Sequence, residues 1–220
     1  MRNRAYSNNG NSDIAKNTLY VRYMISLRCK RIVKEELEKL NITHSVLNYG
    51  AIEFYDVVST KDISTLKRNL QKSGLLLMDQ STSNLIDRII DTIIHAVHSF
   101  DELPKLSYSE IIINNIKEAN ESVFKIFSEV VGMSIVQFIV IQKVERIKEL
   151  LLYETLTLSE ISDKLNYQNE QQLIAQFKKH TGLTPAHYLV IKNERDKIRT
   201  KVFTSVADKK QCVTTSSHNS

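Results

Sequence analysis

The sequence predicts an α+β fold in which a small βαββαβ unit precedes a region that is entirely helical. Three observations carry this prediction. Alternating apolar runs and amphipathic segments over residues 17–80 follow the order strand, helix, strand, strand, helix, strand. After residue 80 the apolar side chains recur only at helical spacing, and a chain of 220 residues has room for two small domains.

The elements of the first unit follow from apolar spacing and turn residues. Gly50 marks a tight turn between the second and third strands, and Gly74 is expected to cap the second helix. This order predicts a split βαβ, ferredoxin-like domain over residues 17–80. We expect strands at 19–25, 45–49, 51–58 and 75–79, and helices at 29–40 and 59–73.

The remaining segments are a connecting helix and two tails. Apolar residues from Leu85 to Val97 recur at helical spacing, and Pro104 ends the connecting helix predicted at 81–104. Residues 1–16 and 201–220 are rich in small polar side chains, so we expect a disordered tail and a flexible tail there. A second domain is expected at 105–200.

That second domain contains an internal repeat. Shifting the chain by fifty residues pairs similar residues in one register without a gap, which predicts two copies of one helical unit. The paired residues are Leu106 with Leu156, Glu110 with Glu160, Ile111 with Ile161, Val123 with Leu173, Phe127 with Phe177, Gly132 with Gly182, Ser134 with Thr184, and Phe138 with Tyr188.

The second copy has the signals of a helix, a tight turn and a helix. Thr157 and Glu160 form a capping box for a short helix that stops near Asn166, a residue type that tolerates left-handed backbone. Asn169 can cap a second helix, which Gly182 ends. In the first copy Ser107 is expected to start the supporting helix, and a long helix over 135–153 joins the two copies.

The exposed arc of each second helix predicts binding to double-stranded DNA. Glutamine can bond an adenine edge through two hydrogen bonds and lysines suit phosphates. Glu121 in the first copy could accept from cytosine or repel phosphate, and we favour repulsion. The predicted contact residues are Ser122, Lys125, Asn169, Gln171, Gln172, Ala175, Lys178 and Lys179.

Bulk properties exclude several classes of protein. No apolar run approaches the roughly 20 residues of a membrane helix, and residues 1–10 lack the apolar core of a signal peptide, so we expect a cytoplasmic protein with Cys29 and Cys212 reduced. No glycine-rich phosphate loop, metalloprotease motif or nucleophile turn is present, so no enzyme is expected. The net charge is +5, but residues 105–200 carry only +1, from thirteen Lys and Arg against twelve Asp and Glu.

The helical half resembles the AraC family of bacterial transcription regulators. The motifs that carry the resemblance are Glu145-Arg-Ile-Lys-Glu-Leu-Leu151, Leu156-Thr-Leu-Ser-Glu-Ile161 and Phe177-Lys-Lys-His-Thr-Gly-Leu-Thr-Pro185. The resemblance implies two helix-turn-helix units in successive major grooves about 34 Å apart. It also implies an operator as partner, with RNA polymerase as a further candidate. A second copy of the chain could pair through an edge strand of the expected sheet or through the helix from Ser83 to His98.

The sequence departs from the family pattern at two positions, one on the exposed arc and one in the core. Ala175 stands where relatives often carry a polar residue, and Asn115 stands where the second copy has the core residue Leu165. We therefore expect a degenerate first unit and most of the binding energy from the second.

The N-terminal half resembles a heavy-metal-associated domain, whose metal loop reads Met-x-Cys-x-x-Cys. Here the loop runs from Met24 to Cys29, and Ser26 replaces one thiolate, so one chain cannot form the usual two-sulfur site. Met24 with Cys29, or Cys29 from two subunits, could bind a soft metal weakly, but we favour Met24 as a core residue and Cys29 without a role. No certain cofactor is expected, and the alternative function is a metal carrier or sensor whose helical half is a docking module.

Overall fold

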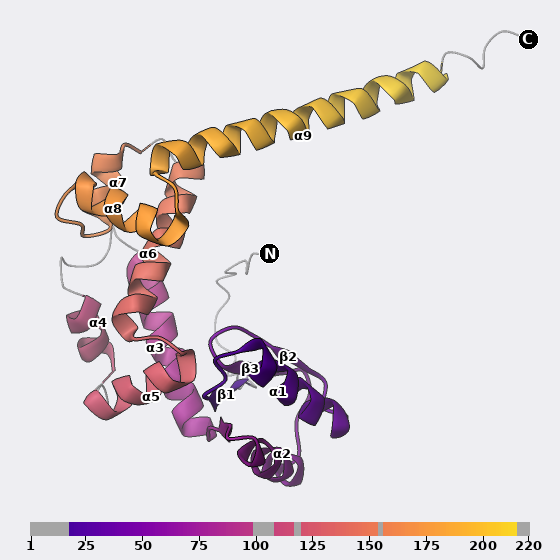
Figure 1. Ribbon diagram of the computed structural model, residues 1–220, viewed down its shortest axis with the longest axis vertical. Helices are drawn as coiled ribbons and strands as arrows, with labels where there is room; N and C mark the ends of the chain where they lie inside the picture. Colours follow the sequence, from indigo (N-terminus) through magenta and orange to yellow (C-terminus); the bar gives the residue numbers. More distant parts are fainter. Residues whose placement is uncertain (1–17, 99–107, 117–119, 154–155, 215–220) are drawn as a thin grey trace, which may run out of the picture. The chain divides into compact units, whose positions relative to one another are not determined.

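The computed structural model describes residues 18–98, 108–116, 120–153 and 156–214 (Figure 1), with the side chains of 109 and 200–214 left undescribed. The tail expected at 1–16, together with Pro104 and Ser107, lies outside these residues. The chain divides into two compact units, Met1–Asp91 with Ile113–Ile135 and Thr92–Ile112 with Val136–Ser220.

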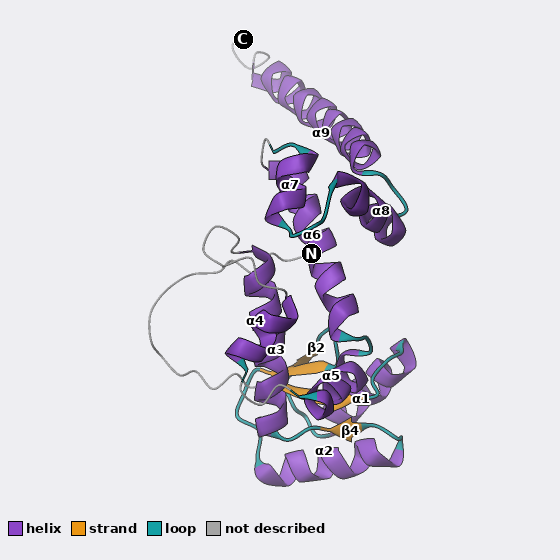
Figure 2. Cartoon of the chain, turned by 90° about the vertical axis from the view of Figure 1, so that its left-hand side faces the viewer, coloured by secondary structure: helices purple, strands orange, loops and turns teal. Residues whose placement is uncertain are grey.

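A four-stranded antiparallel sheet forms the centre of the first unit (Figure 2). Its strand order is β2-β3-β1-β4, so the two edge strands are β2 and β4. Every neighbouring pair is antiparallel, with Leu19 opposite Ile52 and Val21 opposite Leu77. The strands are β1 (Thr18–Arg22), β2 (His44–Val46), β3 (Ala51–Phe54) and β4 (Leu76–Leu77).

Two amphipathic helices, α1 (Leu27–Lys39) and α2 (Thr60–Lys72), close the core against the sheet. Ser26 and Ser59 cap them, because each side chain accepts a hydrogen bond from the backbone three residues on. The apolar faces of these helices supply Val33, Leu37, Leu66 and Leu70 to a core shared with strand residues.

The strands are shorter than the sequence pattern predicts, and one cap differs. β1 ends at Arg22 because Tyr23 has a φ of 69°, which no strand residue can adopt. The extended run expected to Val58 pairs only as far as Phe54. Ser73 rather than Gly74 is the C-cap of α2, and Gly74 follows it with a φ of 75°.

The helix α3 (Gln80–His98) follows β4 and begins on the first unit. The backbone N–H of Tyr20 donates to Ser83 Oγ over 3.2 Å, and the hydroxyl of Tyr20 donates to Asp87 over 2.9 Å. These bonds fix the first turns of α3 against β1. The same unit contains α5 (Glu121–Val131), while α4 (Tyr108–Asn115) spans the division between the units.

The second unit is helical, and its last helix continues beyond the expected boundary. Its helices are α6 (Ile135–Tyr153), α7 (Leu158–Lys164), α8 (Glu170–Thr181) and α9 (Pro185–Thr214). The sequence predicts a flexible tail from residue 201, but α9 extends to Thr214.

Among the described residues no single helix is both long and apolar enough to cross a membrane, and only the bent pair of α5 and α6 taken together would pass on length and composition.

Candidate nucleic-acid interface

The helix pair α7–α8 begins with the capping box that the sequence predicts. Glu160 N–H donates to Thr157 Oγ1 over 3.2 Å, and Thr157 N–H donates to Glu160 Oε2 over 2.7 Å. The second of these bonds lowers the pKa of Glu160 below its ordinary value, because it favours the ionised carboxylate. The first turn of α7 is thereby fixed from both sides.

A tight turn joins α7 to α8. Asn166 adopts the expected left-handed conformation, with a φ of 51°, and Tyr167 N–H donates to the carbonyl of Ser162. Asn169 caps α8 by accepting from Gln172 N–H over 2.9 Å, and Gln172 Oε1 in turn accepts from Gln168 N–H over 2.8 Å. The turn is therefore defined by side chains as well as by its backbone.

The two helices share a small apolar core that fixes which face of α8 meets solvent. The side chains of Ile161, Leu165, Leu173 and Phe177 are completely buried. Tyr188 of α9 packs edge-on against Phe177, with ring centres 5.7 Å apart. The opposite face of α8 is exposed, and it presents Gln171, Gln172, Ala175, Lys178 and Lys179.

Two of the predicted contact residues already have structural partners. The side-chain oxygen of Asn169 is taken up by the cap, and that of Gln172 by the turn. Gln171, Lys178 and Lys179 are exposed, and no described residue gives their side chains a hydrogen bond or an ion pair. This face offers amide and ammonium groups suited to base edges and phosphates.

In the first copy, α5 has the same kinds of cap as α8, with its N-cap shifted by one residue from the fifty-residue register. Asn120 caps α5, and Gly132 ends it in left-handed conformation, as Gly182 ends α8. Asn115 is exposed, whereas the next residue, Ile116, is 1% exposed. The strict fifty-residue register therefore pairs the buried Leu165 with an exposed residue and misses the buried one beside it. The predicted arc of the first copy, Glu121, Ser122 and Lys125, is exposed.

The C-terminal end of α5 is attached to the N-terminal sheet. Arg22 of β1 forms an ion pair with Glu129, and Tyr23 N–H donates to the carbonyl of Glu129 over 3.0 Å. Gly50 lies so close that a Cβ there would stand 2.6 Å from the carbonyl oxygen of Val130. The sequence did not predict this contact, since no local pattern encodes it.

A buried lysine lies beside α8 in the second unit. Lys143 of α6 is 8% exposed, and its Nζ lies 4.1 Å from the ring centre of Tyr167 and 4.9 Å from that of Tyr108. The ring faces stabilise the ammonium, while burial lowers the pKa of Lys143 to about 8 and raises those of both tyrosines. The signal for its burial was its spacing, four residues after Ile139 and four before Ile147.

The residues considered for a metal are placed differently from a metal loop. Met24 is 4% exposed and belongs to the core, as favoured from the sequence. Cys29 is half-buried, and its Sγ accepts a hydrogen bond from Ser26 over 3.2 Å. Within the described residues no group of three or more His, Cys, Asp or Glu side chains could hold a metal ion.

Comparison with known families gives a match over part of the helical region. Residues 120–190 match the family model of a helix-turn-helix domain, a span that contains α5, α6, α7, α8 and the start of α9. The F1 operon positive regulatory protein of Yersinia pestis is 42% identical over 65 residues, which are 30% of this chain and 22% of that protein. The chain therefore spans about a fifth of the length of this curated relative.

Solved structures give weaker alignments. The C-terminal domain of AraT, a response regulator from Geobacillus stearothermophilus, aligns at 22% identity over 47% of this chain and 82% of its own, with a TM-score of 0.40. The xylose-binding transcription activator xylR aligns at 24% over 52% and 27%, with a TM-score of 0.39. The DNA-binding domain of AdpA, solved with a target DNA, aligns at 17% over 49% and 95%, with a TM-score of 0.41. Scores this low do not establish a common fold.

Proposed function

We propose that this chain is a sequence-specific DNA-binding regulator of transcription of the AraC type. The observation that carries the proposal is the exposed face of α8, on which Gln171, Lys178 and Lys179 stand opposite the buried Leu173 and Phe177. A helix of this kind, held by a capped partner across a tight turn, suits entry into a major groove. The helix-turn-helix match over residues 120–190 and the positive regulatory protein of Yersinia pestis support it.

The N-terminal unit would act as a sensing or dimerisation domain with ferredoxin-like topology. Its βαββαβ order and its β2-β3-β1-β4 sheet support this topology. Its link to DNA binding would be α5, whose last turn contacts Arg22 and Tyr23. A metal-carrier function has less support, because Met24 belongs to the core and Ser26 caps a helix.

The experiment that tests the proposal is selection of random duplex DNA by the purified chain at near-physiological salt, followed by a salt titration of the selected sequence. A motif of two elements about one helical turn apart would support two working units. A single short motif would support one working unit, α7–α8. Absence of any enriched sequence, with α7–α8 shown to be folded by hydrogen exchange, would overturn the proposal.

A further inference from the structure

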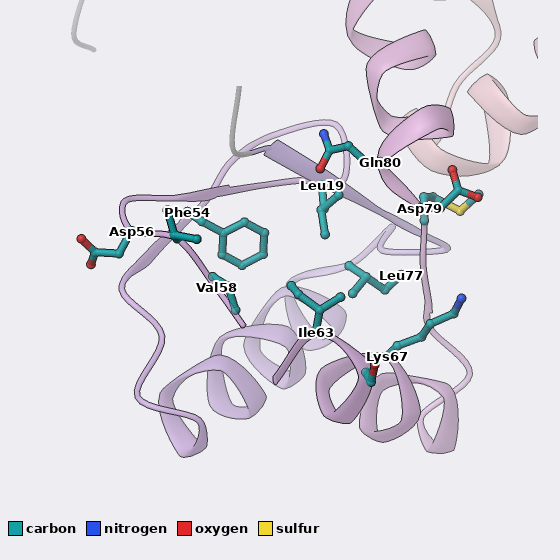
Figure 3. Close-up of a pocket in the computed structure, with 12 residues that line it drawn as sticks. Leu19, Phe54, Asp56, Val58, Ile63, Lys67, Leu77, Asp79 and Gln80 are labelled. Atoms are coloured by element: carbon teal, nitrogen blue, oxygen red, sulfur yellow. The ribbon is translucent and has the colours of Figure 1, made fainter. Parts of the chain in front are cut away.

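Two pockets in this chain differ in the charges that line them. A pocket of about 410 Å³ in the N-terminal unit has two carboxylates, Asp56 and Asp79, against one lysine, Lys67 (Figure 3). A second pocket, of about 240 Å³, lies in the helical unit and is lined by residues of α4, α6, α8 and the turn before α8. Among the described residues that line this second pocket, Lys143 is the one charged group and none carries a carboxylate. The charges of the second pocket therefore favour an anion, whereas those of the first do not.

Lys143 is a buried cation without a counter-ion among the described residues. It is 8% exposed, and the ring centres of Tyr167 and Tyr108 lie 4.1 Å and 4.9 Å from its Nζ. No described residue forms a hydrogen bond or an ion pair with this ammonium. Its pKa of about 8 leaves it mostly protonated at neutral pH. Because buried charges are ordinarily paired, an anion in the pocket would supply the partner that Lys143 lacks.

The other polar groups of this pocket have hydrogen-bond donors to offer. Gln172 Oε1 accepts from Gln168 N–H, which leaves the amide NH₂ of Gln172 to donate. Gln176 Oε1 accepts from the hydroxyl of Tyr167, which leaves a second amide NH₂. The hydroxyl of Tyr108 is buried and has no hydrogen-bond partner among the described residues. The pocket thus combines one ammonium with a hydroxyl and two amide groups that can donate.

We propose that this pocket binds one phosphate group, with Lys143 as its cation and Tyr108 as a further donor. A volume of about 240 Å³ is smaller than the roughly 300–1,000 Å³ typical of sites for drug-sized ligands, so the pocket suits a compact oxyanion. Phosphate presents several acceptor oxygens, and lysine is a common partner for it. Val136, Asn166 and Gln172 line the pocket and are exposed, so the pocket is reached from solvent.

The phosphate group can come from free phosphate or from the DNA backbone. Gln172 lines the pocket and also belongs to the exposed face of α8. The pocket therefore borders the surface proposed to meet DNA, and the backbone source rests on the proposed function. Free phosphate needs no DNA. Either source would contact elements of both helix-turn-helix copies, because Tyr108 begins α4 and Tyr167 lies in the turn before α8.

The first arm of the test uses the full chain without DNA and inorganic phosphate as the probe. Phosphate replaces chloride at constant ionic strength and neutral pH, while NMR follows the Cε signal of Lys143 and the amide signal of Tyr167. Both signals should shift and saturate as phosphate is added. The Cε signal of Lys148 should stay in place, because Lys148 lies on the same helix, pairs with Glu145 and does not line the pocket.

Two variants test the donors, with the Tyr167 amide signal as the readout. Lys143→Met should weaken phosphate binding at least about tenfold, as the loss of a charge-assisted hydrogen bond predicts, and Lys148→Met is the matched control. Tyr108→Phe should weaken it by about two- to tenfold. Thermal unfolding of Tyr108→Phe should be unchanged, because the hydroxyl has no described partner to lose.

The second arm measures the affinity for the selected duplex at several salt concentrations. If the site holds a backbone phosphate, Lys143→Met should lower the salt slope by about 1 and Lys148→Met should not. If the site holds free phosphate, the slope should stay and the first arm alone should respond. Phosphate binding that Lys143→Met left unchanged would overturn the inference, and so would the absence of any response in both arms. Failure to select any DNA would overturn the proposed function but leave the first arm intact.

Discussion

At the scale of single residues, two glycines show how the cost of adding a side chain depends on the surrounding atoms. Gly50 and Gly74 both have left-handed backbone, with φ values of 80° and 75°. A Cβ at Gly74 would meet nothing within 4 Å, whereas one at Gly50 would meet the carbonyl oxygens of Val130 and Val21. A side chain at Gly74 would therefore cost stability through backbone conformation alone, whereas one at Gly50 would also cost stability through steric overlap.

We expect Gly74→Ala to cost about 1 kcal/mol of unfolding free energy, from backbone conformation alone. Gly50→Ala should cost roughly 3 kcal/mol or more, because its methyl group must also push the last turn of α5 away from the sheet. Chemical denaturation followed by circular dichroism measures both values. Equal costs for the two variants would contradict the close approach of α5 to Gly50.

Lys143 predicts a pH dependence with a definite sign. Its pKa is about 8 in the folded chain and near 10.5 when unfolded, so between these values the unfolded state binds more protons and the unfolding free energy rises with pH. Below pH 8 both states are protonated and the contribution is constant. From pH 8 to 10 the natural chain should gain about 1–3 kcal/mol relative to Lys143→Met. If the unfolding free energies of the natural chain and of Lys143→Met changed with pH in parallel, Lys143 would not be the source of the pH dependence.

At the scale of helices and strands, local sequence signals predicted where most elements occur, but they did not predict which elements contact one another. Thr157, Asn169 and Gly182 fix where helices begin and end through bonds to neighbouring backbone, so these boundaries could be read from the sequence. The early end of β1 and the attachment of α5 to the sheet depend on distant contacts. No pattern within either segment encodes those contacts.

If α8 enters a major groove as proposed, Gln171 is expected to contact bases and Lys178 to contact phosphates. Gln171→Ala should reduce the preference for the selected operator over scrambled DNA by about tenfold, because a bidentate bond to a base is lost. Lys178→Ala should weaken binding to both duplexes alike and lower the salt slope by about 1. Fluorescence anisotropy with both duplexes measures this, with Lys61→Ala in the other unit as control.

Gln172 is a less direct probe of base recognition than its neighbour. Its side chain also accepts from Gln168 N–H, so Gln172→Ala should lose about 1 kcal/mol of stability in addition to any base contact. If Gln171→Ala and Lys178→Ala lowered affinity for both duplexes equally, α8 would not recognise bases through Gln171.

At the scale of the whole molecule, the compact units do not coincide with the matched domain. The helix-turn-helix match begins at residue 120, yet Ile113–Ile135 belongs with the sheet. The repeat in the sequence suggested one continuous helical domain over 105–200. The family match is defined by sequence similarity, whereas the compact units are defined by contacts between residues. Helix α5 lies within the family match and also within the compact unit that contains the sheet.

This division predicts which segments unfold together. Leu66→Ala creates a cavity in the first unit and should cost about 2–5 kcal/mol, so amide exchange in β1 and α5 should accelerate together. Leu173→Ala is the matched change in the second unit, and it should accelerate exchange in α8 while α5 stays protected. Exchange of α5 that followed α8 rather than β1 would contradict the division.

The close approach of Gly50 to Val130 also decides where this chain could be joined to a related one in a chimeric protein. A hybrid spliced at residue 105 would provide this sheet with a foreign α5, and a carbonyl or side chain that does not match Gly50 and Arg22 would leave the sheet uncovered. A junction after Ile135 would keep α5 on its own sheet and exchange only the second helix-turn-helix unit. The end of α5, rather than its beginning, is therefore the point at which this chain can be cut and recombined.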